Sequence, residues 1–203
     1  MSLKGKETNL KMVGPSVTDT YNLAAAVALL SEFGLTDLEL QRSIEKLEII
    51  KSRYQEIDIG GKHVILSVAK GQNPVACSRV FDLIRRYEGR KAVVLMVDDL
   101  GDAKTTSENI SWLYDADFEF LRDDSITQIV CSGVRNLDYR VRLLIAGIDP
   151  DRITCVRQEA DAASAVDLAR ADTIFFLYDV YTVSHAKTAE AVLRARLETK
   201  EGE

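Results

Sequence analysis

The stretch YQEIDIGGKHVILSVAKGQNP, residues 54–74, contains the signals that decide the fold. Residues 54–59 and 63–68 are runs of strand length that flank Gly60 and Gly61, a pair typical of the tight turn between two antiparallel strands. The second run contains the apolar segment VIL, which favours a buried strand. The stretch therefore predicts a β-hairpin that leads into the core of a sheet.

Downstream of the hairpin, apolar runs alternate with segments of helical periodicity. We expect strands at 92–97, 126–131, 153–156 and 173–177, and helices at 160–171 and about 184–197. Two further helices are expected, one with Ala76, Val80, Leu83 and Ile84 inward and one with Leu137, Val141, Leu144 and Ile145 inward. This alternation predicts an α/β fold, a Rossmann-like, mainly parallel sheet with helices on both faces.

Upstream of the hairpin, the pattern predicts two helices in sequence. Gly34 stands where a left-handed residue would end the first helix, and Thr36 with Glu39 has the spacing of a capping box at the start of the second. The residues expected to be buried are Leu23, Val27, Leu30, Leu40, Ile44 and Leu47, with Leu35 packing against Leu40. We therefore expect a tail at 1–18, an N-terminal helical hairpin at 19–52 and an α/β domain at 53–200.

Composition excludes several classes of function. The chain has 203 residues and 46% hydrophobic content, enough for one substantial core, and its net charge of -6 disfavours nucleic-acid binding. It has no apolar run of the roughly 20 residues that span a bilayer, and its first residues lack the apolar segment of a signal peptide, so we expect a cytoplasmic protein. Cys77, Cys131 and Cys155 form no CxxC pair, so we expect small buried residues and no metal site.

Functional groups in such sheets collect in the loops beyond the carboxyl ends of the strands. In this chain those loops are expected at 69–74, 98–109, 132–136, around Arg157 and at 178–182. The sequence contains no GxGxxG, GxxxxGK[ST] or HExxH motif, so we expect this chain to bind no ATP tightly by itself.

Several of these segments resemble the Mur ligase family, and within it the MurT branch. Residues 21–26, YNLAAA, are similar to the helix start that joins the family's central and final domains, and residues 53–56 are similar to its GRxE-like segment. Residues 67–74, SVAKGQNP, resemble the AKNP form of the MurT branch with Gly71 and Gln72 inserted.

Further matches follow in the order that the branch has them. They are Asp98-Asp99, the run SWLYDADFE at 111–119, Ser132-Gly133 with Arg135, Asp138, Arg142, Ala146 and Gly147, and Tyr181-Thr182. The loop after Asp99 is longer than the family form, and Glu108-Asn109 stands where the family has an aspartate before the Ser-Trp pair.

The resemblance implies the C-terminal domain of an ATP- and Mg-dependent amide ligase of peptidoglycan biosynthesis, with residues 19–52 forming the end of the central domain. It implies a glutamine amidotransferase partner (GatD-like) that supplies ammonia, and a lipid-linked muropeptide substrate, the D-glutamate of lipid II, which is converted to D-isoglutamine. We expect this chain alone to be inactive.

The resemblance also implies candidate site residues. An acid of the final domain orients the partner's catalytic histidine, and the candidates are Asp99 first, then Asp102 and Glu108. The alternative is that Asp98 and Asp99 cap the next helix or face solvent.

Lys70, Asn73 and Arg135 are candidate substrate-binding residues. The alternatives are a solvated lysine and an ion pair of Arg135 with Asp138 and Arg142 along one helix. His63 and His185 have no recognisable acid partner in the sequence, and Trp112, Tyr114 and Phe118 are expected in the core or in a partner interface.

Two other classes of function remain open at this stage. One is another ligase of the same superfamily, a UDP-N-acetylmuramoyl-peptide or folylpolyglutamate synthase. The other is a non-enzymatic Rossmann-like binding module.

Overall fold

The computed structural model describes residues 2–3, 6–7, 10, 17–46, 54–97, 109–179 and 182–200, and the chain divides into two units, Met1–Lys51 and Ser52–Glu203. In the first unit, β1 (Ser2–Leu3) pairs with β2 (Lys6–Glu7) in an antiparallel ladder, and two helices follow, α1 (Val17–Glu32) and α2 (Asp37–Lys46). The predicted pair of helices is therefore present.

The turn between α1 and α2 has the predicted chemistry. Gly34 ends α1 with φ of 90°, a conformation that glycine adopts without steric cost. The Thr36 amide donates to Glu39 Oε2 at 2.9 Å, and the Glu39 amide donates to Thr36 Oγ1 at 3.4 Å, which completes the capping box. Val27, Leu40 and Ile44 are buried as expected. Leu30 is 38% exposed instead, and Leu47 lies outside the described residues.

The second unit contains a six-stranded sheet in the order β3-β4-β8-β5-β6-β7. Its strands are β3 (Tyr54–Ile59), β4 (Lys62–Val68), β5 (Lys91–Met96), β6 (Ile126–Ser132), β7 (Ile153–Val156) and β8 (Thr173–Tyr178). Only β3 and β4 are antiparallel, joined through Gly60 and Gly61, whose φ values are both positive. All other neighbouring pairs are parallel, so the predicted mainly parallel sheet is confirmed.

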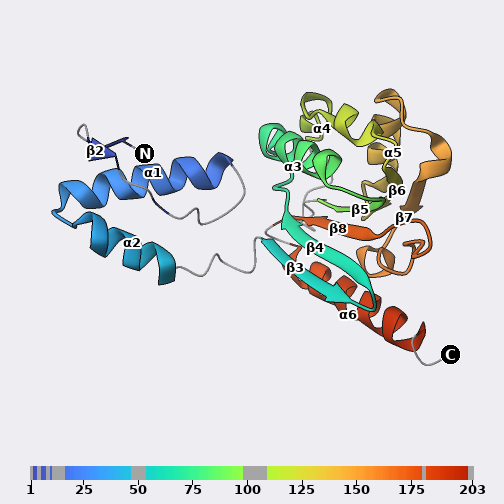
Figure 1. Cartoon of the computed structure of the whole chain (residues 1–203). Helices are drawn as coiled ribbons and strands as arrows, with labels where there is room; N and C mark the ends of the chain where they lie inside the picture. The colour runs from blue at the N-terminus through green and yellow to red at the C-terminus, as the bar shows by residue number, and fades with distance from the viewer. Residues whose placement is uncertain are drawn as a thin grey trace. The chain divides into compact units, whose positions relative to one another are not determined.

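Helices cover both faces of this sheet, as predicted (Figure 1). One face carries α3 (Pro74–Arg86), α4 (Trp112–Asp115), the 3-10 helix η1 (Phe118–Arg122) and α5 (Asn136–Ile145). The other face carries α6 (Val183–Lys200) and the 3-10 helix η3 (Glu159–Asp161), while η2 (Pro150–Arg152) precedes β7. None of the described helices is long and apolar enough to cross a membrane.

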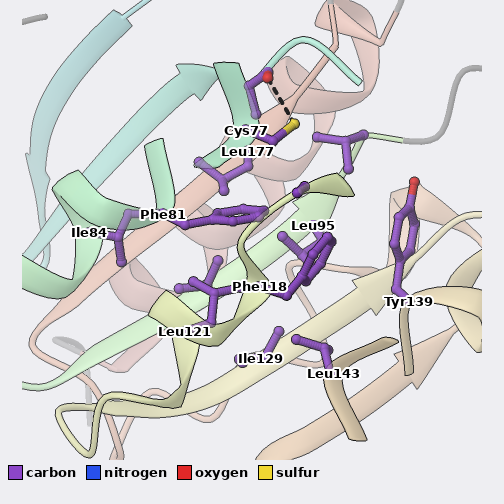
Figure 2. Packing of buried hydrophobic residues seen from close by; sticks show 14 of the residues in the cluster. Cys77, Phe81, Ile84, Leu95, Phe118, Leu121, Ile129, Tyr139, Leu143 and Leu177 are labelled. Carbon is purple, nitrogen blue, oxygen red and sulfur yellow. Dashed lines mark hydrogen bonds between the residues drawn. The ribbon is translucent and has the colours of Figure 1, made fainter. Parts of the chain in front are cut away.

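The core under α3 is built around two phenylalanines. Phe81 of α3 and Phe118 of η1 are fully buried, with ring centroids 4.9 Å apart, and they pack with Leu95 of β5 and Leu177 of β8 (Figure 2). The Cys77 thiol in the same cluster donates to the Ala69 carbonyl at 3.1 Å. This cluster fixes α3, and therefore the loop that precedes α3, against the sheet.

One helical face was predicted correctly in part, and another was predicted in the wrong phase. In α3, Ile84 is buried as predicted and Val80 packs partly buried against the core, whereas Leu83 is exposed and Cys77, Ser78 and Phe81 are buried instead. In α5 the four residues predicted inward, Leu137, Val141, Leu144 and Ile145, are all exposed, and the helix buries Asn136, Tyr139, Arg142 and Leu143 instead. The reason in α5 is that a charged residue, Arg142, has its hydrogen-bond partners on the core side.

Residues 160–171 do not form the predicted α-helix. They form η3 followed by turns, and other side chains satisfy the polar groups of their backbone. Gln128 accepts from the Asp167 amide at 2.8 Å and donates to the Ala165 carbonyl at 3.0 Å, and Arg196 of α6 donates to the Val166 carbonyl at 3.0 Å. Ala162 and Ala163 are fully buried, so the segment packs closely against the sheet.

Arg142 holds the α4–η1 segment to α5. Its guanidinium donates to the carbonyls of Leu113 and Ala116 at 2.8 and 2.9 Å and to both carboxylate oxygens of Glu119. The same bond lowers the pKa of Glu119 below its ordinary value of 4.5, chiefly because the charged carboxylate accepts from Arg142. Among the described residues, Arg142 is therefore paired with Glu119. It does not join the ion pair with Arg135 and Asp138 that was expected along α5.

Replacing Glu119 with glutamine should flatten the dependence of stability on pH in acid. Because the folded-state pKa of Glu119 is depressed, its stabilisation is complete above the ordinary value of 4.5 and is lost as pH falls through the lower, folded-state pKa. Urea unfolding at about pH 7 and about pH 3.5 should show a smaller loss of stability for Glu119→Gln than for the wild type. Asp124→Asn, at a fully exposed carboxylate, is the control, and equal losses for Glu119→Gln and the wild type would contradict the assignment.

Candidate functional site

The topology places a switch point at the carboxyl end of β8. The chain leaves β4 toward α3 on one face of the sheet and leaves β8 toward α6 on the other, and these two strands are neighbours. On its other side β8 pairs with β5. The next described residues after β5 lead into α4, which lies on the same face of the sheet as α3. Ligands of open α/β sheets bind where neighbouring connections diverge in this way.

The loop after β4, residues 69–73, lies at this switch point. The Ala69 amide donates to the Tyr178 carbonyl of β8 at 2.9 Å, and the Asn73 amide donates to the Lys70 carbonyl at 3.1 Å, which closes a tight turn. Lys70 and Gln72 have positive φ values of 49° and 63°. The side chain of Lys70 is exposed.

Gly71 lies against the end of β5, so alanine at this position should destabilise the protein. An added Cβ would come within 2.4 Å of the Val97 carbonyl oxygen, and the backbone must move to relieve this overlap. We expect Gly71→Ala to lower the free energy of unfolding by about 1–3 kcal/mol, measured by urea denaturation. Val75→Ala, at a neighbouring exposed position, should change it little. Equal stability of the two variants would show that the loop does not pack here.

Asn73, a predicted substrate-binding residue, has a structural partner. Its Oδ1 accepts from the Ala76 amide at 3.0 Å, which makes it the N-cap of α3, with Pro74 at the first helical position. Burial raises the pKa of the nearby Cys77 thiol to about 12, so this group is neutral. The cap fixes the start of α3 next to the switch point.

The loop after β8 brings a buried acid, which sequence reasoning did not single out, to the switch point. Asp179 is only 4% exposed, and its Oδ2 lies 3.4 Å from the position that a Cβ on Gly71 would take. Thr182 fixes the loop, because its Oγ1 accepts from the Asp179 amide at 2.9 Å and donates to the Met96 carbonyl of β5 at 3.0 Å. The signal in the sequence was an acid directly after an apolar strand, inside the predicted loop 178–182.

The loop after β6 carries the third predicted binding residue, Arg135. Ser132 donates to the Leu95 carbonyl at 2.7 Å, and Asn136 Nδ2 donates to the Gly133 carbonyl at 2.6 Å, so the loop is held at both ends. Arg135 lies at the start of α5, 3.8 Å from Asp138 Oδ2. Lys70 and Arg135 thus leave the same edge of the sheet, but β8 and β5 separate their strands.

The three candidate acids, Asp99, Asp102 and Glu108, lie outside the described residues, as does Tyr181. Val97, the last described residue before that segment, is buried and follows β5, the strand next to β8. The described chain resumes at Asn109, whose Oδ1 accepts from the Ser111 amide at 3.0 Å. Trp112 and Phe118 are buried as predicted, whereas Tyr114 is exposed.

Both histidines have acid partners, contrary to the sequence-based expectation. His185, in the first turn of α6, is bonded to Glu159, which is almost buried after β7. His63 lies at the start of β4, where its Nδ1 is 2.8 Å from Asp58 Oδ1 and its ring stacks on Tyr87. These acids are distant in the chain or across a hairpin, so periodicity did not reveal them.

The geometry agrees with the comparisons to known proteins. The family model described as MurT ligase C-terminal matches residues 71–183, more than half of the chain. The lipid II isoglutaminyl synthase (glutamine-hydrolyzing) subunit MurT of Staphylococcus aureus (strain COL) is 27% identical over 149 residues, and that of Streptococcus pneumoniae (strain R6) is 28% identical over 154. The matches cover 73% and 75% of this chain but only 32% of each relative, so the chain spans about a third of their length.

Solved structures support the same fold. The UDP-N-acetylmuramate-alanine ligase MurC of Thermotoga maritima superposes with a TM-score of 0.68 over 94% of this chain and 40% of its own, at 14% identity. FolC of E. coli, in complex with DHPP and ADP, superposes with a TM-score of 0.58 over 96% of this chain and 42% of its own, at 20% identity. The chain belongs to the MurT ligase C-terminal family.

Proposed function

We propose that this chain is the C-terminal domain of an ATP-dependent amide ligase of peptidoglycan biosynthesis, a MurT subunit acting in the cytoplasm. With a GatD-like glutaminase partner, the whole protein would amidate the D-glutamate of lipid II to D-isoglutamine. The observation that carries this proposal is the family match at residues 71–183, which runs from the loop after β4 to the first residue of α6. It therefore includes most of the described residues around the switch point at β8.

In this proposal the domain contributes positive charge and shape to a site completed by the rest of the protein. Lys70 is exposed at the carboxyl edge on a turn that is fixed by backbone hydrogen bonds to β8 and within the loop. A lysine in this position suits an anionic phosphate or carboxylate group. Arg135, three strands along the same edge, would contact a more distant part of the substrate or the partner.

ATP and Mg²⁺ belong, in this proposal, to the part of the protein that this chain does not cover. The chain has no GxxxxGK[ST] motif, and the described residues contain no group of three or more His, Cys, Asp or Glu side chains arranged to hold a metal ion. The nucleotide, when bound elsewhere, would supply activation of the substrate carboxylate. This domain would orient the activated group and exclude water.

The test uses the full-length protein with its glutaminase partner, lipid II, ATP and glutamine. The expected product is lipid II with one carboxyl group replaced by a carboxamide, identified by mass spectrometry, with glutamine as the nitrogen source in a ¹⁵N-amide experiment. An added amino-acid residue, formed without glutamine, would indicate a stem-peptide ligase instead. Glutamylation of a folate would indicate a folylpolyglutamate synthase, and no ATP consumption with any of these substrates would favour a binding module.

Replacing Lys70 with methionine should weaken the ligase step in that assay. Loss of one charge-assisted contact should lower kcat/KM for lipid II amidation about 10- to 100-fold. Glutamine hydrolysis by the partner should be much less affected, because the proposed role of Lys70 is toward the ligase substrate. Lys187→Met, an exposed lysine on α6, is the matched control. An unchanged kcat/KM for Lys70→Met would exclude Lys70 from the site.

A further inference from the structure

We propose that Cys131 and Cys155 form a redox-sensitive pair that closes to a disulfide when the protein meets hydrogen peroxide. The two residues are direct partners on neighbouring parallel strands, Cys131 on β6 and Cys155 on β7. Nothing in the proposed ligase function requires them. The inference is therefore independent of that function.

The backbone places the two side chains within reach of each other. Paired residues on neighbouring strands are about 4.8 Å apart and point to the same face of the sheet. This separation falls within the range of roughly 4.4–6.8 Å between the Cα atoms of disulfide-bonded cysteines. Both side chains belong to the core on the α3–α5 face, where Cys155 packs against the buried cluster that contains Cys131. The strand pairing therefore already holds the two Cα atoms at a separation that a disulfide allows.

The two thiols differ in the way that an attacking and a resolving cysteine must differ. Cys131 is fully buried, whereas Cys155 is only partly buried. Interaction with the neighbouring Cys131 thiol, with the positive charge of Arg140 on α5, lowers the pKa of Cys155 to about 7 against the opposing effect of burial. The pKa of Cys131 is raised well above 9, chiefly by its interaction with Cys155 and by burial. Cys155 thus carries the reactive thiolate.

The chemistry balances with peroxide as the oxidant. The Cys155 thiolate attacks one peroxide oxygen, the O–O bond breaks, and Cys155 becomes a sulfenic acid while hydroxide leaves and takes up a proton. The Cys131 sulfur then attacks the Cys155 sulfur, its proton goes to the departing hydroxyl group, and water leaves. In sum, two thiols and one hydrogen peroxide give one disulfide and two waters. A thiol reductant reverses the modification by exchange.

The pair lies beside the loop that carries Arg135. Cys155 Sγ contacts the carbonyl of Asn136, the first residue of α5, at 3.8 Å, and Cys131 is followed directly by Ser132 and Gly133. A disulfide would remove the hydrogen bond that the Cys155 thiol donates to Asn136. It would also link β7 covalently to β6 near the start of α5. The disulfide would therefore alter the structure of the loop that carries Arg135, at the edge of the sheet where the candidate site lies.

The experiment treats the protein with hydrogen peroxide and digests it with trypsin without reduction. The expected product is a cross-link between the peptides DDSITQIVCSGVR (123–135) and ITCVR (153–157), removed by dithiothreitol. Cys77→Ser should form the same cross-link, because the Cys77 thiol is fully buried and protonated. Cross-links that involve Cys77, or only intermolecular disulfides, would overturn the proposal.

Single variants separate the roles of the two thiols. Cys131→Ser should stop at the sulfenic acid, which dimedone labels on Cys155, whereas Cys155→Ser should give no dimedone adduct on Cys131. In the wild type, the rate of iodoacetamide labelling at Cys155 should rise with pH around a midpoint of about 7. Recovery of both peptides as free thiols from peroxide-treated wild type, which needs no variant to fold, would reject the proposal outright.

Discussion

Glutamine hydrolysis by the complex of the full-length protein with its glutaminase should fall roughly 10³–10⁴-fold when Asp99 is replaced by asparagine. In the proposed arrangement the carboxylate fixes the tautomer of the partner's catalytic histidine and stabilises its charged form. An asparagine keeps the shape but loses the charge, and it presents an N–H group to the wrong ring tautomer. Steady-state ammonia release, measured on the assembled complex, checks this result.

The asparagine substitution also distinguishes this role from the structural alternative. Asparagine caps a helix about as well as aspartate, so a capping Asp99 predicts unchanged turnover for Asp99→Asn. Asp102→Asn and Glu108→Gln complete the series, and the variant with the largest loss identifies the acid. Asp124→Asn, at an exposed carboxylate before β6, is the control. Full activity in all three loop variants would remove the catalytic acid from this loop.

The hairpin and the strands could be predicted because their signals are local. Gly60 and Gly61 provide the positive φ values of a tight turn, and each buried strand is a short apolar run bounded by polar residues. The strands at 54–59 and 153–156 were predicted with the bounds that the structure has, and the others differ by one residue at one or both ends. The parallel arrangement followed from the alternation of strands and helices.

The helical faces could not be predicted so well because burial depends on partners that are far away in the chain. Arg142 is buried because it donates hydrogen bonds to the carbonyls of Leu113 and Ala116. The sequence pattern of α5 gives no sign of these partners. Residues 160–171 have helical composition, but Gln128 and Arg196 satisfy their backbone in a tighter path. Tertiary hydrogen bonds thus prevailed over local propensity.

The sequence predicted the location of the candidate site better than it predicted the residues that form it. The rule for carboxyl-edge loops located the turns at 69–73, 132–136 and after Tyr178, and the structure brings the first and last of these together around β8. Asp179 was missed because only the packing of its loop against Gly71 distinguishes it from any other loop acid. The role of Asn73 as a helix cap likewise needed the position of the Ala76 amide.

Replacing Phe81 with alanine should lower the free energy of unfolding by about 3–5 kcal/mol, whereas Leu83→Ala on the same helix should cost less than about 1 kcal/mol. Periodicity alone put Leu83 in the core, but its side chain is 36% exposed, whereas Phe81 is fully buried against Phe118, Leu95 and Leu177. Removing the Phe81 ring leaves a cavity among side chains that sheet strands hold in place, so the core cannot close around it. Urea denaturation of the two variants decides between the faces of α3. Equal costs would mean that α3 is rotated relative to the sheet, and the loop at 69–73, which α3 anchors through Asn73 and Cys77, would then have to be placed anew.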